Sequence, residues 1–369
     1  MNERPTVAIV HLGTVGSMGG RRRVASLTAI FIAAGAVVVE VPLLVDHRLG
    51  LGDLPRLGLG SVIRGRSVPE SLAWSHRSTL ERLHRVDADL VVCATVRAFH
   101  PALLHGPWTV VIDYVDKLSD SYLDRSRIVG RTPRSLLFRM LAATAGRFEG
   151  RPLPPGTRGI AAGWDDAQAL GLDWVPITVD IPPPQRAGEP EHDILFLGKL
   201  SYPPNVEAIE RLGRMWPAVQ HARPGTTLLL AGAAPSAAIL ALAKRHGWTV
   251  MADFADLSTV AASARIATAP LQHASGIQIK VLEAAAFGLP QVIGTAVAKG
   301  FGPDLPAVVI DNDHDLVVAL TDLLNDPGEQ ARLGAAAKAH VTERYSVERW
   351  APWATAVLQE LSGQRPHSP

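Results

Sequence analysis

The chain of 369 residues is 47% apolar and 19% charged, with a formal net charge of +1 at pH 7. This balance is typical of a globular protein, excludes a disordered chain, and lacks the basic excess of a nucleic-acid-binding domain. The length predicts two domains. Because Cys93 is the only cysteine, an intramolecular disulfide and a cysteine-based zinc site are excluded.

The N-terminus carries charged residues followed by a short strand-like run, a pattern typical of neither a signal peptide nor a membrane anchor. The longest apolar run, residues 27–39, is too short for a membrane span and breaks at Gly35 into a helix and a strand. We therefore expect a cytoplasmic protein.

The first expected elements are a buried strand at residues 5–12, a glycine-rich loop with a helix starting after Gly20, and a second strand from residue 36. The loop has two interpretations. It is either a simple turn or the dinucleotide fingerprint of an NAD(P)-dependent oxidoreductase. The residues that match the fingerprint are Gly13, Gly16, Gly19 and Glu40.

A later strand in the same half, PWTVVIDYVD, ends in two acids, Asp113 and Asp116. Ligands collect at the carboxyl ends of the strands in an open parallel sheet, so these acids are placed where a substrate would bind. Either acid alone also fits a cap of the following helix.

Residues 125–158 form a basic stretch whose helical spacing gives one apolar side, made of Leu136, Leu137, Met140 and Leu141. Against two acids, Asp124 and Glu149, it carries Arg125, Arg127, Arg131, Arg134, Arg139, Arg147, Arg151 and Arg158. Two interpretations stay open: a solvated helix packed on its domain, or an amphipathic face that contacts a membrane or an anionic ligand.

A proline-rich linker at residues 181–191 divides the chain, so that residues 1–180 form the first predicted domain. The α/β pattern restarts in residues 192–345, with a helix that is expected to open at an Asn205 N-cap. Residues 346–369 carry a final helix with apolar anchors at three- and four-residue steps: Trp350, Trp353, Val357 and Leu358.

The stretch 269–295 combines the features of a phosphate site. A strand over residues 264–270 is followed by small residues, Ala274 to Gly276, and then by a helix that Gly288 and Pro290 stop. The positive end of this helix, with Lys280 one turn in, suits a diphosphate. Glu283 lies two turns beyond Gly276, so it can face the same site and accept hydrogen bonds from ribose hydroxyls.

This stretch resembles the C-terminal signature of GT-B glycosyltransferases, particularly family 4, which carry an E-x7-E pattern. Glu283, followed by Ala284, is the second glutamate, whereas Ser275 stands at the first position. Lys280 matches the variant G-x-x-x-K-x-x-E that starts at Gly276. The resemblance covers most of residues 190–345. It implies two Rossmann-like domains facing across a cleft, with the C-terminal helix crossing back to the N-terminal domain.

The resemblance also implies site residues. Lys199 clamps the donor diphosphate, Lys280 replaces the second lysine of the usual pair, and the loop at Asp253 and Phe254 frames the base. The implied catalytic residues are Lys199, Lys280, Asp113 and Asp116, the two acids as candidates to orient the acceptor. The implied donor-binding residues are Gly19, Gly20, Gly198, Phe254, Ser275, Gly276, Ile277 and Glu283.

The implied activity is sugar transfer from a nucleoside-diphosphate sugar to an acceptor with retention of anomeric configuration, without a metal or another cofactor. The acceptor can be a small metabolite, a lipid-linked glycan or a thiol. Two alternatives remain: the NAD(P)-dependent oxidoreductase, and a GT-B relative that performs epimerisation or non-glycosidic coupling on a sugar nucleotide.

Overall fold

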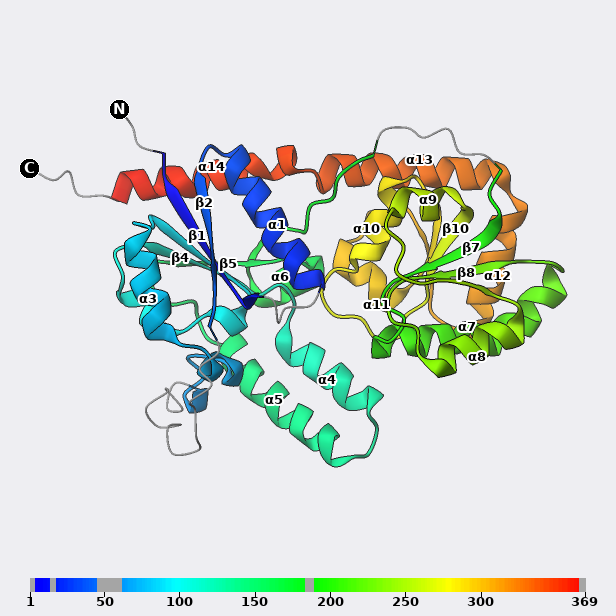
Figure 1. Cartoon of the computed structure of the whole chain (residues 1–369), viewed down its shortest axis with the longest axis horizontal. Helices are drawn as coiled ribbons and strands as arrows, with labels where there is room; N and C mark the ends of the chain where they lie inside the picture. Colours follow the sequence, from blue (N-terminus) through cyan, green and yellow to red (C-terminus); the bar gives the residue numbers. More distant parts are fainter. Residues whose placement is uncertain (1–3, 14–17, 45–61, 183–188, 365–369) are drawn as a thin grey trace, which may run out of the picture. The chain divides into compact units, whose positions relative to one another are not determined.

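The computed structural model describes residues 4–13, 18–44, 62–182 and 189–364. The chain divides into two compact units, which are Met1–Thr178 with Val347–Pro369, and Val179–Ser346 (Figure 1). Part of the predicted linker, residues 183–188, lies outside the described residues. Among the described helices, none combines the length and the apolar character needed to cross a bilayer.

The first unit is built on a parallel sheet with strand order β2-β1-β3-β4-β5-β6. The middle of each central strand is a continuous apolar run, because helices cover both faces of a parallel sheet. The strands are β1 (Thr6–His11), β2 (Val37–Pro42), β3 (Leu90–Ala94), β4 (Thr109–Asp113), β5 (Thr157–Ala161) and β6 (Asp173–Trp174).

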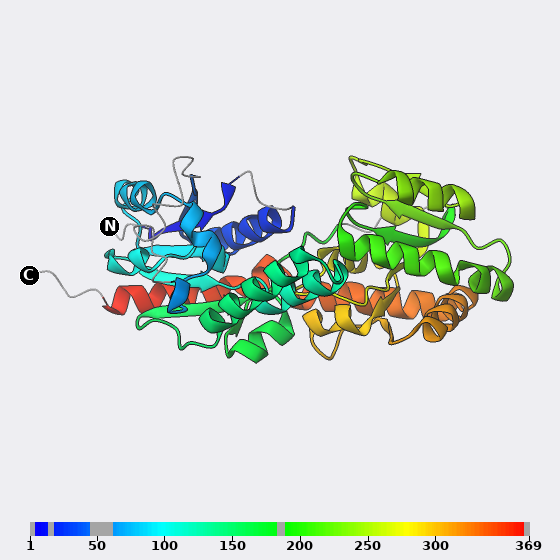
Figure 2. The ribbon, with the colours of Figure 1, turned by 90° about the horizontal axis from the view of Figure 1, so that it is seen from below.

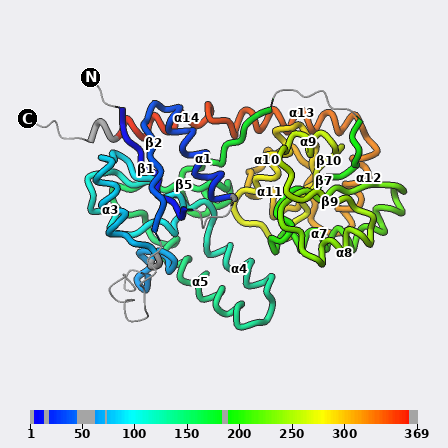
Figure 3. Tube along the Cα trace, in the orientation of Figure 1, coloured from blue at the N-terminus to red at the C-terminus, as the bar shows by residue number. Residues whose placement is uncertain are grey.

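Helices on both sides bury this sheet in two apolar clusters. One cluster joins α1 to the last helix, α14, and contains Phe31, Trp350 and Val357 (Figure 3). The predicted return of the C-terminal helix is therefore confirmed. The helices are α1 (Met18–Ala33), η3 (Pro69–Ala73), α3 (His76–Arg85), η4 (Val96–Ala98), η5 (Pro101–His105), α4 (Leu118–Ile128), α5 (Pro133–Glu149), α6 (Trp164–Leu170) and α14 (Val347–Gln364).

The second unit repeats the plan with strand order β12-β11-β10-β7-β8-β9, again parallel. Its strands are β7 (His192–Leu197), β8 (Leu228–Ala231), β9 (Thr249–Met251), β10 (Ala264–Ala269), β11 (Gln291–Gly294) and β12 (Val308–Ile310). Its helices are α7 (Pro203–Ala222), α8 (Ala237–His246), α9 (Leu257–Ala262), α10 (Ile279–Ala286), α11 (Thr295–Ala298), η6 (Lys299–Phe301), α12 (Asp313–Asn325) and α13 (Pro327–Arg344). The predicted pair of Rossmann-like α/β domains is confirmed.

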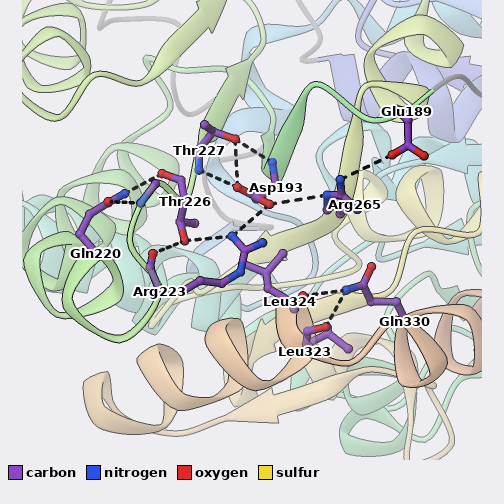
Figure 4. A network of polar contacts seen from close by, with 11 residues as sticks. Glu189, Asp193, Gln220, Arg223, Thr226, Thr227, Arg265, Leu323, Leu324 and Gln330 are labelled. Atoms are coloured by element: carbon purple, nitrogen blue, oxygen red, sulfur yellow. Dashed lines mark hydrogen bonds and ion pairs between the residues drawn. The ribbon is translucent and has the colours of Figure 1, made fainter.

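A polar network holds the amino edge of the second sheet (Figure 4). The backbone N–H of Thr227 donates to Asp193 Oδ2 at 2.9 Å, and Thr227 Oγ1 accepts from the backbone N–H of Asp193 at 2.9 Å. Arg223 and Arg265 lie 3.2 and 3.6 Å from the Asp193 carboxylate. These contacts fix the starts of β7, β8 and β10, so that the opposite, carboxyl edge is left for ligands.

His76 and His100 stack in the first unit, with their ring centroids 3.7 Å apart. His100 Nδ1 accepts from the backbone N–H of Ala102 at 3.1 Å, which stabilises the neutral ring. Burial, together with His76, lowers the pKa of His100 to about 4, and burial also lowers the pKa of His76. The folded state therefore favours two uncharged rings.

We expect the first unit to lose stability as the pH falls from about 6.5, the ordinary histidine pKa, towards 4, because the unfolded chain then binds more protons than the folded one. His100→Asn keeps an acceptor for Ala102 and removes the titration. The acid-induced loss in unfolding free energy, measured by urea titration at pH 7.5 and 4.5, should be smaller in this variant by about 2 kcal/mol. An equal acid-induced loss of unfolding free energy in the wild type and the variant would show that His100 does not cause it.

Candidate functional site

The second sheet has a switch point between β7 and β10. The chain proceeds from β7 through β8 to β9 on one side, and β10 then begins the other side. The loops after β7 and β10 diverge there, which is where parallel α/β sheets bind ligands. The loop after β7 starts with Gly198 and Lys199, and the loop after β10 leads to Ser275, Gly276 and α10. The structure thus brings these two predicted segments together.

Gly198 ends β7 in a conformation that needs a glycine. Its φ is +143°, and a Cβ atom there would lie 2.8 Å from Asn205 Nδ2 and 3.6 Å from Lys280 Nζ. The side chain of the next residue, Lys199, is exposed. The two predicted lysines therefore differ in their surroundings, one solvated and one enclosed.

Lys280 points from α10 towards the end of β7. Its ammonium donates a hydrogen bond to Asn205 Oδ1 and lies 5.0 Å from the centroid of the Phe196 ring. Burial lowers the pKa of Lys280 to about 7, so this amine is only partly charged near neutral pH without an anionic partner. Such an amine at a switch point is suited to bind an anion.

Asn205 is the site residue that the sequence did not reveal. The predicted N-cap role is wrong, because α7 begins at Pro203 behind Tyr202, and proline is favoured in the first helical position. Asn205 is 4% exposed; its Nδ2 donates to the carbonyl of Lys199 at 2.9 Å, while its Oδ1 accepts from Lys280. It therefore links the two lysine-bearing segments.

Helix α10 starts later than the sequence suggested. The predicted start near Ile277 is corrected to Ile279, because the backbone of the N-cap Gln278 is extended, with φ −88° and ψ 96°. Gly276 has a φ of +62°. Ser275, Gly276 and the buried Ile277 thus form the turn before the helix rather than its first amides. Gly300 permits this turn, since a Cβ there would lie 2.4 Å from the carbonyl oxygen of Gly276.

The two remaining predicted donor-binding residues of this unit are Glu283 and Phe254. Glu283 lies on α10, three residues after Lys280, and is half-buried. Phe254 follows β9 and packs partly buried against the apolar cluster around Leu229. Both lie at the carboxyl edge, where a ligand in the switch point could reach them.

The predicted glycines of the first unit belong to α1. The helix begins at Met18 rather than after Gly20, so Gly19 and Gly20 lie half-buried in its first turn. Of the dinucleotide fingerprint, Gly16 lies outside the described residues. Glu40 is exposed and lies 3.5 Å from His11 Nε2.

Asp113 is enclosed rather than facing an open edge. Its side chain is fully buried, and Arg23 of α1 donates to both carboxylate oxygens, at 2.7 and 3.0 Å. Asp113 Oδ1 also accepts from the backbone N–H of Val115 at 3.0 Å. Asp116, in contrast, is half-buried in the loop to α4, directly after Val115, whose φ of +60° is strained for a β-branched residue.

A pocket of about 340 Å³ lies at the carboxyl ends of β10, β11 and β12. The loop after β10, which also carries Ser275 and Gly276, lines it with Leu271, Gln272 and His273. The other lining residues are Arg211, Gly294, Thr295, Ala296, Ile310 and Asp311. Within the described part of the chain, no group of three or more His, Cys, Asp or Glu side chains is placed to hold a metal ion.

Residues 191–326 match the family model described as glycosyl transferases group 1. The second unit carries a group 1 glycosyltransferase domain. This match contains Gly198, Lys199, Asn205, Lys280 and Glu283. No curated protein matches the chain significantly in sequence.

Solved structures similar to this chain over nearly its whole length show that it has the GT-B fold. Sucrose-phosphate synthase (tll1590) from Thermosynechococcus elongatus is 14% identical with a TM-score of 0.67, and the match covers 98% of this chain and 100% of that one. A glycosyltransferase from Rickettsia africae ESF-5 is 10% identical with a TM-score of 0.68 and the same coverage. Anabaena Alr3699/HepE in complex with UDP-glucose is 15% identical with a TM-score of 0.64, covering 96% and 99%.

We expect Gly198→Ala to destabilise the protein by about 2 to 4 kcal/mol, because it combines an unfavourable φ with a clash against the buried Asn205 amide. Gly225→Ala is the matched control: its φ is also positive, at +79°, but nothing lies within 4 Å of its Cβ position. The control should lose only about 1 kcal/mol in urea unfolding. An equal loss of unfolding free energy in the two variants would contradict the expected clash with Asn205.

Proposed function

We propose that this chain is a retaining glycosyltransferase that moves a sugar from a nucleoside-diphosphate sugar to an acceptor. The observation that carries the proposal is Lys280, an enclosed amine with a pKa of about 7 that lies beside the Gly198 turn at the switch point of a group 1 domain. An anionic diphosphate is the ligand that would restore its full charge.

The proposed chemistry depends on the leaving group. When the bond between the anomeric carbon and the diphosphate breaks, the diphosphate gains negative charge, and groups that bind it more tightly at that moment accelerate the step. Lys280 and Lys199 are proposed to supply this stabilisation. A charge-assisted hydrogen bond contributes about 1.5 to 3 kcal/mol, so two lysines account for part of a typical enzymatic acceleration.

The other predicted residues complete this proposal. Glu283 binds the ribose hydroxyls, Phe254 frames the base, and the turn of Ser275, Gly276 and Ile277 contacts the donor. Gly19 and Gly20 are also proposed as donor-binding residues. Retention implies that the departing phosphate takes the acceptor proton, without a metal ion. Because both oxygens of Asp113 accept from Arg23, we propose Asp116 alone to orient the acceptor.

The first experiment compares stabilisation by nucleotides. A ligand that binds only the folded state raises the melting temperature with occupancy. We expect one of UDP, GDP, ADP or dTDP to raise it, with UDP tested first because a structural neighbour binds UDP-glucose. Stabilisation by NAD or NADP alone would instead support the oxidoreductase alternative.

We expect Lys280→Ala and Lys199→Ala each to lower the rate of sugar transfer at least tenfold, which is about 1.4 kcal/mol of transition-state stabilisation. The donor in this assay is a sugar nucleotide of the nucleoside diphosphate that stabilises the protein. Lys244→Ala, on the exposed surface of α8, is the control and should retain the full rate. Melting curves establish that each variant is folded. Near wild-type rates in both site variants would end the proposal.

The donor affinity should depend on pH. The free protein must protonate Lys280, whose pKa is about 7, before the amine can pair with the diphosphate. The dissociation constant of UDP-glucose should thus be steady below pH 7 and rise towards tenfold per unit above it, with proton uptake visible by calorimetry in buffers of different ionisation enthalpy. Lys280→Met should bind weakly at all pH values without this slope.

A further inference from the structure

Helix α5 of the first unit presents an apolar face that no described residue covers. Leu136, Leu137 and Met140 are 63%, 54% and 62% exposed, and their spacing of one and four residues places them on one side of the helix. Figures 1 and 2 show α4 and α5 as an antiparallel pair that extends from the sheet of this unit. Large side chains gathered this way mark an interaction surface.

The opposite side of α5 is fixed by packing. Ala142, Ala145 and Phe148 are buried, and the Ser135 hydroxyl donates to the carbonyl of Ser126 in α4 at 3.1 Å. Phe138 stacks on Tyr122 with centroids 6.2 Å apart. The helix therefore cannot rotate to bury its apolar face without losing these contacts.

The charge around this face has one sign. The exposed ionised residues are Arg125, Arg127, Arg131, Arg134, Arg139 and Arg147, and residues 125–148 contain no acid. Glu149, the one acid of α5, is buried, and its pKa is raised by that burial. Arg127 pairs with Asp124 at 2.8 Å, which precedes the acid-free segment.

We propose that this α5 face docks on an anionic membrane surface, with Leu136, Leu137 and Met140 in the boundary between headgroups and acyl chains and the arginines on lipid phosphates. A helix with an apolar strip edged by arginines and free of acids fits this environment. A protein partner would need acids placed opposite each guanidinium, whereas an anionic bilayer offers phosphates at every position.

The test is co-sedimentation of the full chain with vesicles of phosphatidylcholine alone or mixed with phosphatidylglycerol. We expect binding to the mixed vesicles only, weakened by added salt. Arg134→Glu with Arg139→Glu should lower the partition coefficient more than twentyfold, since each arginine near such a surface contributes about fivefold. Leu136→Ser with Met140→Ser should lower it at least tenfold.

Two control variants carry single substitutions of the same kinds, apolar to serine and arginine to glutamate, on other helices. Ile32→Ser removes an apolar side chain that is 57% exposed on α1, and Arg245→Glu reverses an exposed charge on α8. Both should bind like the wild type, and melting curves verify folding of all variants. No binding of the wild type, equal binding to neutral vesicles, or equal losses in the controls would overturn the proposal. Because no donor is added, the result is independent of the proposed transferase activity.

Discussion

The hydrogen bond from the Lys280 ammonium to Asn205 Oδ1 is the contact on which the site depends. Through Asn205, which also donates to the carbonyl of Lys199, it ties α10 to the loop after β7. The amide is neutral, so it positions the lysine without neutralising it. Burial then leaves Lys280 poised between its charged and uncharged forms, which an anionic ligand would shift to the charged form.

Glycines make this geometry possible. At Gly198 a side chain would displace Asn205, and at Gly300 a side chain would strike the Gly276 carbonyl. The first constraint acts within one loop and helix start, whereas the second acts between the segment before α10 and the segment after β11. A glycine that a turn requires locally, such as Gly276, can be recognised from the residues beside it in the sequence. A glycine that is needed because the backbone of another segment packs against it, such as Gly300, cannot be recognised in this way.

The first unit uses its charges differently. Arg23 and Asp113 form a buried bidentate pair, and Arg23 Nη1 also donates to the carbonyls of Val175 and Pro176, at 2.6 and 2.9 Å. This pair fixes α1 over the end of β4, and breaking such a pair costs about 3 to 5 kcal/mol. An acid at the carboxyl end of a strand therefore need not face a ligand. On α5, by contrast, the arginines stay solvated beside exposed leucines, and that surface is available to a partner.

The sequence by itself determined the repeated α/β pattern and the parallel sheets, because strand and helix periodicity act locally along the chain. The return of the C-terminal helix was implied by the family resemblance, since periodicity alone gives an amphipathic helix without its partner. The sequence also located the segments around Lys199, Lys280 and Glu283. Only the tertiary structure decided that Asn205 joins two of these residues, that α10 begins at Ile279, and that Asp113 is enclosed by Arg23. The Lys280–Asn205 and Arg23–Asp113 contacts join residues that lie 75 and 90 positions apart, which no local pattern encodes.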